Sequence, residues 1–355
     1  MKNNWLAKIL LSPFSLIFAS IISLRNIFYE AGLLKATSFN IPIINVGNLS
    51  LGGTGKTPHI EYLIKLLSPF LKVGTLSRGY KRKSKGFRMV RSNDNANMSG
   101  DEPLQFKSKF PTVPVAVSES RNIGIPLLIK NHPDIKCILL DDAFQHRSVI
   151  PGLNILLTQY DDLFVDDMLM PSGRLREPKS SYSRADIIVV TKCPEDLSEE
   201  ERNSKLNKIK PYPYQKLFFS KYKYGSPYYI LDKDITINLY PELKVHTVSA
   251  IANSDYMIEY LERSCSIESI IKFEDHHYFS DHEMEHFNKI YVNNPKDNII
   301  FLTTEKDAMR LLIHKEYILA NNLPIFVLPI TVEFMNEDKE AFDDCIKHFL
   351  LNFKT

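Results

Sequence analysis

Cysteine is scarce in this sequence, and neither sign of charge predominates. The 355 residues include four cysteines, which form no CxxC pair and have no histidine at ligand spacing. This usage argues against a disulfide scaffold and fits a reducing cytosol. Lysine and arginine number 44 against 42 aspartate and glutamate, a formal charge of +2. No polyanionic partner is therefore predicted for the chain as a whole, and any charge effect must be local.

The N-terminal segment has an apolar run that is too short for a membrane span. Sixteen uncharged residues lie at 9–24, whereas a spanning helix needs about 20. No small-residue cleavage site follows, so a secretory signal is not predicted. The segment 1–35 has a net charge of +3, from the basic residues Lys2, Lys8, Arg25 and Lys35 and the acid Glu30.

Two interpretations of residues 1–35 are open. An apolar helix with Trp5, Phe14 and Phe18 and a cationic fringe suits one monolayer of an anionic membrane. Alternatively, the segment is a buried helix that packs on the second domain.

The rest of the sequence alternates short apolar runs with helical patterns. This alternation predicts a mostly parallel α/β sheet flanked by helices, and the length suggests two domains. The expected strands are 41–46, 73–76, 113–117, 137–140, 155–157 and 187–190 in the first domain, and 245–250, 299–302 and 325–328 in the smaller second one. Residues 213–232, rich in tyrosine, are predicted to form a two-stranded linker between domains at 36–212 and 233–355.

A glycine-rich loop follows the first expected strand. Residues 47–57 read GNLSLGGTGKT and lead into apolar positions at helical spacing. In this arrangement backbone N–H groups bind phosphate, Lys56 reaches the terminal phosphates and Thr57 offers its hydroxyl to Mg²⁺. Ser50 replaces the first glycine of the general pattern, but the later glycines keep the backbone freedom. The predicted nucleotide site is Ser50, Leu51, Gly52, Gly53, Thr54, Gly55, Lys56 and Thr57.

Two aspartates follow the expected strand 137–140. A metal-binding carboxylate of a P-loop site comes from the end of a neighbouring strand. We therefore predict that Asp141 or Asp142 holds Mg²⁺, and that residues 143–146 turn the chain back under the site.

Ordered motifs along nearly the whole chain resemble those of the tetraacyldisaccharide 4'-kinases, the lipid A 4'-kinases of Gram-negative bacteria. The motifs are NLSLGGTGKTP at 48–58, SRGY at 77–80, GDEP at 100–103, DDAFQH at 141–146, GRLREP at 173–178, TK at 191–192, DH at 275–276 and TEKDA at 304–308. Ala143 stands where the family has glycine, and residues 249–251 read SAI in place of an AGI-type loop. Neither change removes a reactive group.

This resemblance implies ATP-dependent phosphorylation of the 4'-hydroxyl of a tetraacylated glucosamine disaccharide 1-phosphate. It implies two α/β domains joined by a two-stranded linker, with ATP and Mg²⁺ in the cleft, at the cytoplasmic face of the inner membrane. The lipid disaccharide and an inner-membrane monolayer are thus the expected partners, which favours the anchor interpretation of residues 1–35. Nucleic acid is not expected, and no obligate protein partner is evident.

The resemblance also implies roles for single residues beside Lys56. Asp101 is similar to the family's base and His276 to the histidine that orients it, although from the sequence alone Asp101 could simply cap a helix. Asp142 is the alternative base, and Glu177 matches a residue near the metal. The candidate substrate contacts are Asn48, Arg78, Glu102, His146, Arg174 and Arg176.

Three motifs leave alternatives open. Residues 78–91 carry seven basic side chains and no acid, which fits either a solvated loop or a lipid-phosphate patch. Residues 282–286 match the HExxH pattern of zinc hydrolases, but Ser280 and Asp281 resemble a helix N-cap and no third ligand is evident. Residues 189–194 resemble the strand before a guanine-binding motif, although no aspartate stands at the guanine-reading position. A P-loop GTPase or ATPase switch is therefore the alternative function.

Overall fold

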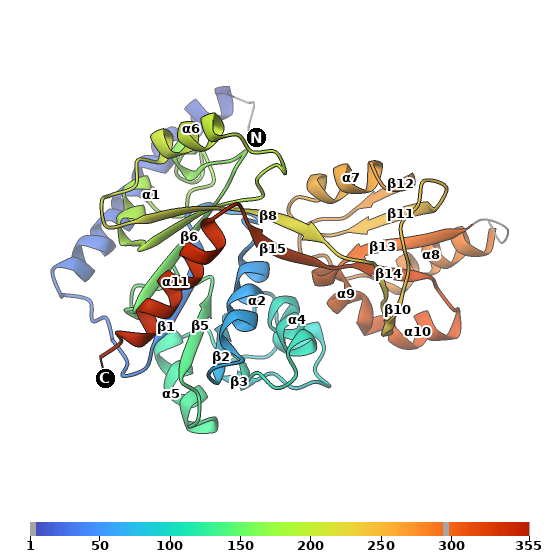
Figure 1. The fold of residues 1–355 in the computed structure, drawn as a ribbon, viewed down its shortest axis with the longest axis horizontal. Coiled ribbons are helices and arrows are strands. Elements are labelled where there is room, and N and C mark those ends of the chain that lie inside the picture. The colour runs from blue at the N-terminus through green and yellow to red at the C-terminus, as the bar shows by residue number, and fades with distance from the viewer. Residues whose placement is uncertain (1–4, 294–297, 355) are drawn as a thin grey trace. The chain divides into compact units, whose positions relative to one another are not determined.

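The computed structural model describes residues 5–293 and 298–354, which form two compact units (Figure 1). Unit 1 comprises Met1–Arg78, Val113–Tyr222 and Val332–Thr355, and unit 2 comprises Gly79–Thr112 and Lys223–Thr331. Lys2, a basic residue of the N-terminal segment, lies outside the described residues. Each unit has a mostly parallel sheet flanked by helices, so the predicted fold class is confirmed.

The sheet of unit 1 carries the glycine-rich loop at the carboxyl end of an inner strand, β1. Its strands lie in the order β15-β8-β7-β6-β1-β5-β2-β4, and the pairs from β8 to β4 are parallel. Their bounds are β1 (Ile43–Asn48), β2 (Val73–Ser77), β4 (Val115–Val117), β5 (Cys137–Asp141), β6 (Leu153–Gln159), β7 (Ile187–Thr191), β8 (Lys216–Tyr224) and β15 (Ile330–Phe334). All strands expected in the first domain are present, because strands buried on both faces read as continuous apolar runs.

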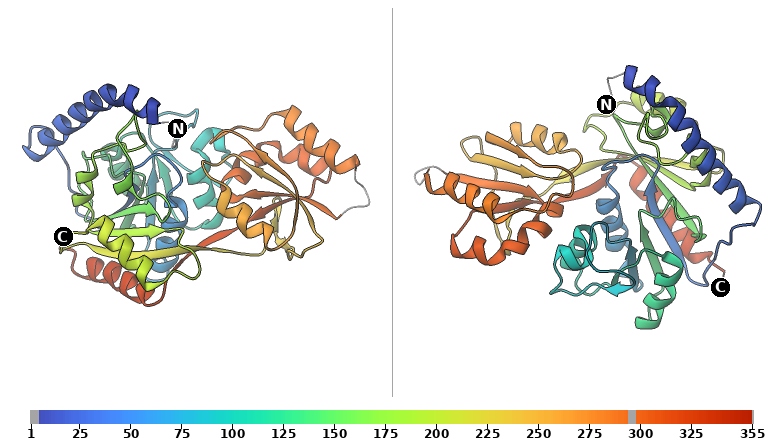
Figure 2. Two further views of the ribbon diagram at one scale, coloured as in Figure 1. Left: turned by 90° about the horizontal axis from the view of Figure 1, so that it is seen from above. Right: turned by 180° about the vertical axis from the view of Figure 1, so that it is seen from behind.

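Helices cover both faces of this sheet. They are α1 (Trp5–Glu30), α2 (Lys56–Leu67), α5 (Arg121–Asn131), α6 (Glu199–Ile209) and α11 (Asp338–Leu351), with the short helices η1 (Phe164–Asp166) and η2 (Lys179–Arg184). Figure 2 shows α1 and α11 on opposite sides of unit 1.

Unit 2 has its own sheet, in the order β10-β9-β14-β13-β11-β12. Its strands are β9 (Tyr228–Tyr229), β10 (Asp232–Thr236), β11 (Lys244–Ser249), β12 (Ser266–Lys272), β13 (Ile299–Thr304) and β14 (Ile325–Leu328). The two-residue strand β3 (Arg88–Met89), which is not part of this sheet, also belongs to the residues of unit 2. Its helices are α3 (Ala96–Ser99), α4 (Asp101–Lys109), α7 (Asp255–Glu262), α8 (Asp281–Asn293), α9 (Glu305–Leu311), η3 (Leu312–His314) and α10 (Lys315–Ala320).

The units differ from the predicted domain boundaries in two places. Residues 79–112, predicted within the first domain, belong to unit 2 because α4 packs against α9. Residues 332–355, predicted within the second, belong to unit 1 because Phe342 of α11 packs on Tyr62 and Phe218, with ring centroids 5.9 and 5.5 Å away. Local sequence patterns do not show that residues 79–112 pack in the second unit or that residues 332–355 pack in the first.

The predicted linker also requires a correction. Residues 213–232 do contain two extended segments, β8 and β9, but these do not pair with each other. β8 lies between β7 and β15, whereas β9 lies between β10 and β14. Besides β7, the neighbour of β8 is therefore β15, more than 100 residues later in the chain. The pairing of β8 with β15 has no signal in the local sequence.

Helix α1 exposes most of its apolar side chains. Among the described residues, one segment meets the length and composition of a membrane-crossing helix, namely Lys8–Glu30 of α1, because the helix continues past the uncharged run. The exposed apolar residues include Trp5, Leu10, Phe14, Leu16, Ile17 and Ile21. A core helix would bury these residues, so the structure does not agree with the buried-helix interpretation.

Candidate active site

The loop between β1 and α2 has the backbone conformation of a phosphate site. Gly52 and Gly55 have φ angles of +119° and +89°, a region that favours glycine. A Cβ atom on Gly55 would also lie 2.8 Å from the Tyr222 hydroxyl oxygen. The positive φ therefore favours glycine at position 55, and a larger residue would also have to displace the Tyr222 hydroxyl.

Lys56, the first residue of α2, lies beside the second aspartate of the predicted pair. Its Nζ is 3.7 Å from Asp142 Oδ1 and 3.4 Å from Asn48 Oδ1. Thr57 follows in the first turn and is buried. Asp142 also accepts hydrogen bonds from Arg176, at 2.8 and 3.1 Å. Burial would raise the pKa of Asp142, but Lys56 and Arg176 hold it well below its ordinary value, so this carboxylate is ionised.

Asp141 ends β5 and is buried. Its Oδ2 accepts a hydrogen bond from the Ser77 hydroxyl at 3.3 Å, and its backbone carbonyl accepts one from Arg121 at 3.1 Å. Burial lowers the pKa of Arg121 to about 10, against the opposing effect of the two aspartates. Arg121 therefore remains charged at neutral pH. No sequence motif indicated that this residue of α5 supports the acidic pair.

The turn after the aspartates explains how alanine replaces the family's glycine. The left-handed φ in this turn belongs to Asp142, at +47°, whereas Ala143 is not among the described residues with positive φ. A Cβ at position 143 is thus free of backbone strain. His146, the last residue of this motif, is half-buried. Burial, with Arg121 and Arg78, lowers the pKa of His146 to about 4, so its ring is neutral near pH 7.

The segment 174–176 pairs with the start of the glycine loop. Leu51 N–H donates to the Arg174 carbonyl at 2.7 Å, and Arg176 N–H donates to the Leu49 carbonyl at 2.8 Å. Ser50 and Leu175 form an antiparallel bridge. Ser50 therefore takes an extended conformation at the position of the usual first glycine. The Arg176 guanidinium also contacts Asn48, so these two predicted substrate contacts already lie together.

Glu177 has partners other than the metal that the resemblance implies. Its side chain is fully buried, Oε1 accepts a hydrogen bond from Arg25 of α1 at 2.7 Å, and Oε2 pairs with Arg184. Ser172, in the same loop, hydrogen-bonds to Ser15 of α1 at 2.8 Å. The loop 169–177 therefore joins α1 on one side to the glycine loop on the other.

Two further side chains, Thr191 and His59, fix the glycine loop, and sequence reasoning missed these contacts. Thr191, at the end of β7, donates to the Thr54 carbonyl at 2.9 Å. His59 Nδ1 lies 2.8 Å from the Gly55 carbonyl oxygen, and its Nε2 lies 3.1 Å from Ser220 Oγ. Burial lowers the pKa of His59 to about 4, only partly opposed by the Gly55 hydrogen bond, so His59 is neutral.

In unit 2 the structure brings Asp101 and His276 together. Asp101, the first residue of α4, is 4% exposed, and its Oδ2 lies 3.0 Å from His276 Nδ1. Its Oδ1 accepts from the Glu102 N–H at 2.9 Å. The N-cap of α4 is Gly100 and no side chain caps the helix, so the capping interpretation is wrong. Burial would raise the pKa of Asp101, but Lys306, His276 and Arg310 hold it well below its ordinary value.

A buried frame supports this pair. Arg310, fully buried, is 3.4 Å from Asp101 Oδ2, donates to the Ala250 carbonyl at 3.0 Å and pairs with Asp307. The Ala250 N–H donates to Asp307 at 3.1 Å, and the Ala250 carbonyl accepts from the His276 N–H at 3.0 Å. Asp307 belongs to the TEKDA motif, whose framework role the spacing alone did not indicate.

The HExxH motif does not form a metal site. Glu283 accepts hydrogen bonds from the Ser280 N–H at 2.6 Å and the Ser280 hydroxyl at 2.9 Å, which is the predicted helix cap. It also lies 3.0 Å from His277 Nε2. Within residues 5–293 and 298–354, no group of three or more His, Cys, Asp or Glu side chains is placed to hold a metal ion.

The oxygen donors beside the glycine loop nevertheless suit Mg²⁺. This ion commonly takes one or two carboxylates together with substrate phosphates and water, so it does not require a group of three protein ligands. The Thr57 hydroxyl and the carboxylates of Asp141 and Asp142 are donors of this kind.

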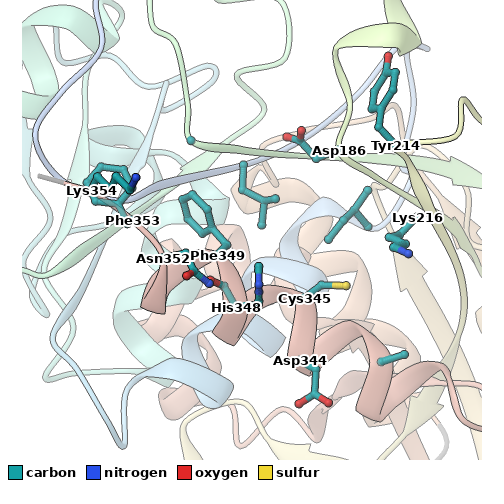
Figure 3. Close-up of a pocket in the computed structure, with 14 residues that line it drawn as sticks. Asp186, Tyr214, Lys216, Asp344, Cys345, His348, Phe349, Asn352, Phe353 and Lys354 are labelled. Atoms are coloured by element: carbon teal, nitrogen blue, oxygen red, sulfur yellow. The ribbon is translucent and has the colours of Figure 1, made fainter.

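A separate pocket of about 880 Å³ lies in unit 1 between the sheet and α11 (Figure 3). Its lining includes Asp186, Lys216, His348, Phe349 and Phe353, and none of the predicted site residues.

Comparison with known proteins identifies the family. The family model for Tetraacyldisaccharide-1-P 4'-kinase matches residues 7–350. The chain belongs to this family. Among similar proteins, the tetraacyldisaccharide 4'-kinase of Flavobacterium johnsoniae is 44% identical over 347 residues, 98% of each chain, and that of Bacteroides fragilis is 42% identical over 343 residues, 95% of this chain and 91% of the relative.

A solved structure agrees with the family assignment. It is described as the apo form of LpxK from Aquifex aeolicus in complex with ATP, and it is 28% identical with a TM-score of 0.74, covering 97% of this chain and 99% of that chain. The chain is therefore a kinase of lipid A biosynthesis by family, and neither the zinc-hydrolase nor the switch interpretation is supported.

Proposed function

We propose that this chain transfers the γ-phosphoryl group of ATP to the 4'-hydroxyl of a tetraacylated glucosamine disaccharide 1-phosphate. The family match across residues 7–350 carries the proposal, and the glycine loop with Lys56 beside an acidic pair supports it.

In unit 1, the glycine loop would bind the phosphates through its backbone N–H groups, and Lys56 would move from Asp142 to the γ-phosphate. Arg176, now paired with Asp142, offers a second cation for the same charge. Thr57, Asp141 and Asp142 are the residues that would hold Mg²⁺. When bound, the ion neutralises charge on the phosphate oxygens.

In unit 2, Asp101 is the base that we propose. The 4'-oxygen forms its bond to the γ-phosphorus while the bond from phosphorus to the bridging oxygen breaks and ADP leaves. The hydroxyl proton passes to the Asp101 carboxylate and then to solvent. Asp142, the alternative base, is instead occupied by Lys56 and Arg176 at the phosphate site.

We further propose that α1 lies in the inner-membrane monolayer at the cytoplasmic face. Its exposed apolar side chains would contact acyl chains. Its polar residues, among them Ser15 and Arg25, bind the loop 169–177 and would keep the helix on the protein. A lipid acceptor could then remain in the membrane during transfer.

The test is a [γ-³²P]ATP assay with the disaccharide 1-phosphate lipid in detergent micelles. The wild type should label the lipid, and Lys56→Ala should abolish labelling, because this substitution removes the mobile cation of the phosphate site. Label released only as inorganic phosphate, or a strong preference for GTP, would favour the switch alternative.

A further inference from the structure

The pair formed by Asp101 and His276 has a cationic neighbour with no assigned role. Lys306, the second residue of α9, has its Nζ 3.3 Å from His276 Nε2 and 3.2 Å from Glu102 Oε1. Burial would lower the pKa of Lys306, but Glu102 and Asp101 raise it above its ordinary value, so the side chain is an ammonium ion.

The chemistry of these three groups leaves one hydrogen-bond arrangement. An ammonium ion has donors and no acceptor, so His276 Nε2 must present a lone pair to Lys306. A neutral imidazole then carries its proton on Nδ1, which faces Asp101 Oδ2 at 3.0 Å. The carboxylate can only accept, so the chain of donors runs from Lys306 to His276 to Asp101.

We propose that Lys306 is a positioning residue that fixes His276 as the neutral tautomer with its proton on Nδ1, directed at Asp101. The proposal rests on the proposed function, in which Asp101 is the base. A ring with its proton on Nε2 would instead direct an N–H at the ammonium of Lys306, which has no acceptor for it.

Without Lys306, the other groups around the His276 ring would allow a proton on Nε2. Asp275 Oδ2 lies 3.8 Å from His276 Nε2 and would favour a proton there. On the other side, Arg310 and Asp307 of α9 lie behind Asp101, and Tyr80 packs on the ring with centroids 4.9 Å apart. Glu102 of α4 faces Lys306. Tyr278 lies near Asp101, and burial together with the Asp101 charge raises the pKa of Tyr278. Lys306 is thus the group that opposes a proton on Nε2.

The experiment compares full-length wild type with Lys306→Met, which keeps the apolar stem, and Lys306→Arg, which keeps the charge and donors. Lys315→Met, at an exposed position of α10, is the matched control. Histidine-selective ¹⁵N NMR of each protein reports the tautomer, and a His276→Gln spectrum assigns the signal among the 10 histidines. Lipid phosphorylation is measured as kcat and KM for ATP across pH.

We expect an Nδ1–H tautomer in the wild type, Lys306→Arg and Lys315→Met, and a proton on Nε2 in Lys306→Met. The kcat of Lys306→Met should fall about tenfold to hundredfold, with KM for ATP within about twofold of wild type. The acid limb of its kcat/KM profile should move to higher pH, because Lys306 lowers the pKa of Asp101. Lys306→Arg should recover most of the activity.

An unchanged tautomer in a folded Lys306→Met protein would overturn the proposal, whatever its activity. An Nε2–H tautomer in the wild type would overturn it without any variant. Glu102→Gln leaves Lys306 in place and should keep the Nδ1–H tautomer. A change of tautomer in this variant would show that the Glu102–Lys306 ion pair, and not the donor at Lys306, sets the proton position, and the proposal would fail. Full activity of Asp101→Asn would instead refute the assignment of Asp101 as the base. The NMR measurement of the His276 tautomer does not depend on that assignment.

Discussion

Glu177 allows a direct choice between a metal ligand and a structural ion pair. Its carboxylate is fully buried between Arg25 and Arg184, whose side chains are 34% and 22% exposed. Glu177→Gln removes the charge and nearly preserves the volume, leaving two guanidinium groups without their acid. Removing one partner of a buried pair costs about 3–5 kcal/mol of unfolding free energy.

This free energy corresponds to a large thermal shift. For a domain of 150–250 residues, 1 kcal/mol lowers Tm by about 2–4 °C, so Glu177→Gln should lower the Tm of unit 1 by about 6–20 °C. The matched control is Glu30→Gln, because Glu30 also pairs with an arginine, Arg147, but is 68% exposed. An exposed pair contributes at most about 1 kcal/mol, so its Tm should change by less than about 4 °C.

The assay is thermal unfolding by circular dichroism in detergent, followed by the Mg²⁺ dependence of lipid phosphorylation below the transition. We expect Glu177→Gln to require the same Mg²⁺ concentration for half-maximal rate as the wild type. If Glu177→Gln and Glu30→Gln had the same Tm and only the former needed several-fold more Mg²⁺, Glu177 would be a metal ligand and the ion-pair interpretation would be refuted.

Three further predictions follow from the site and from α1. Asp101→Asn and His276→Ala should each lower kcat, and the double variant should be little worse than the poorer single one; multiplicative losses would show that the two do not act as a unit. Deleting residues 1–24 should release the protein from inner-membrane vesicles in a flotation assay, and the truncated protein should still bind a fluorescent ATP analogue. Loss of ATP binding would contradict the interpretation of α1 as a membrane anchor. The pKa of His59 is lower in the folded than in the unfolded protein, so the unfolded state binds the proton more tightly. The free energy of unfolding should therefore fall by about 3 kcal/mol between about pH 6.5 and pH 4. Chemical denaturation should detect this loss in the wild type and not in His59→Gln.

The sequence predicted the elements that local pattern determines. Buried parallel strands such as β1 and β5 are apolar runs, and the loop before Lys56 has a recognisable glycine pattern. Two of the residues that the resemblance named, Asp101 and His276, meet in the structure although 175 positions separate them. A physical reading of Asp101 alone would have favoured a helix cap.

What the sequence could not predict depends on contacts between distant segments. The pairing of β15 with β8, and the packing of α4 on α9, unite pieces that have no common local pattern. Buried charged residues are equally hard to predict. Arg310 and Glu177 are of types that usually lie on the surface, and they are buried here because they are paired with opposite charges. The same is true of Lys306, whose significance comes from the ring nitrogen beside it.

The position of the transferred phosphate tests the central claim most directly. The purified protein is incubated with ATP, Mg²⁺ and the disaccharide 1-phosphate lipid, and the product is examined by ³¹P–¹H correlation NMR. We predict one new phosphomonoester signal coupled to the proton on carbon 4' of the distal sugar, absent with Lys56→Ala. A phosphate at another hydroxyl, a diphosphate at carbon 1, or ATP consumption without a new lipid phosphate would contradict the account.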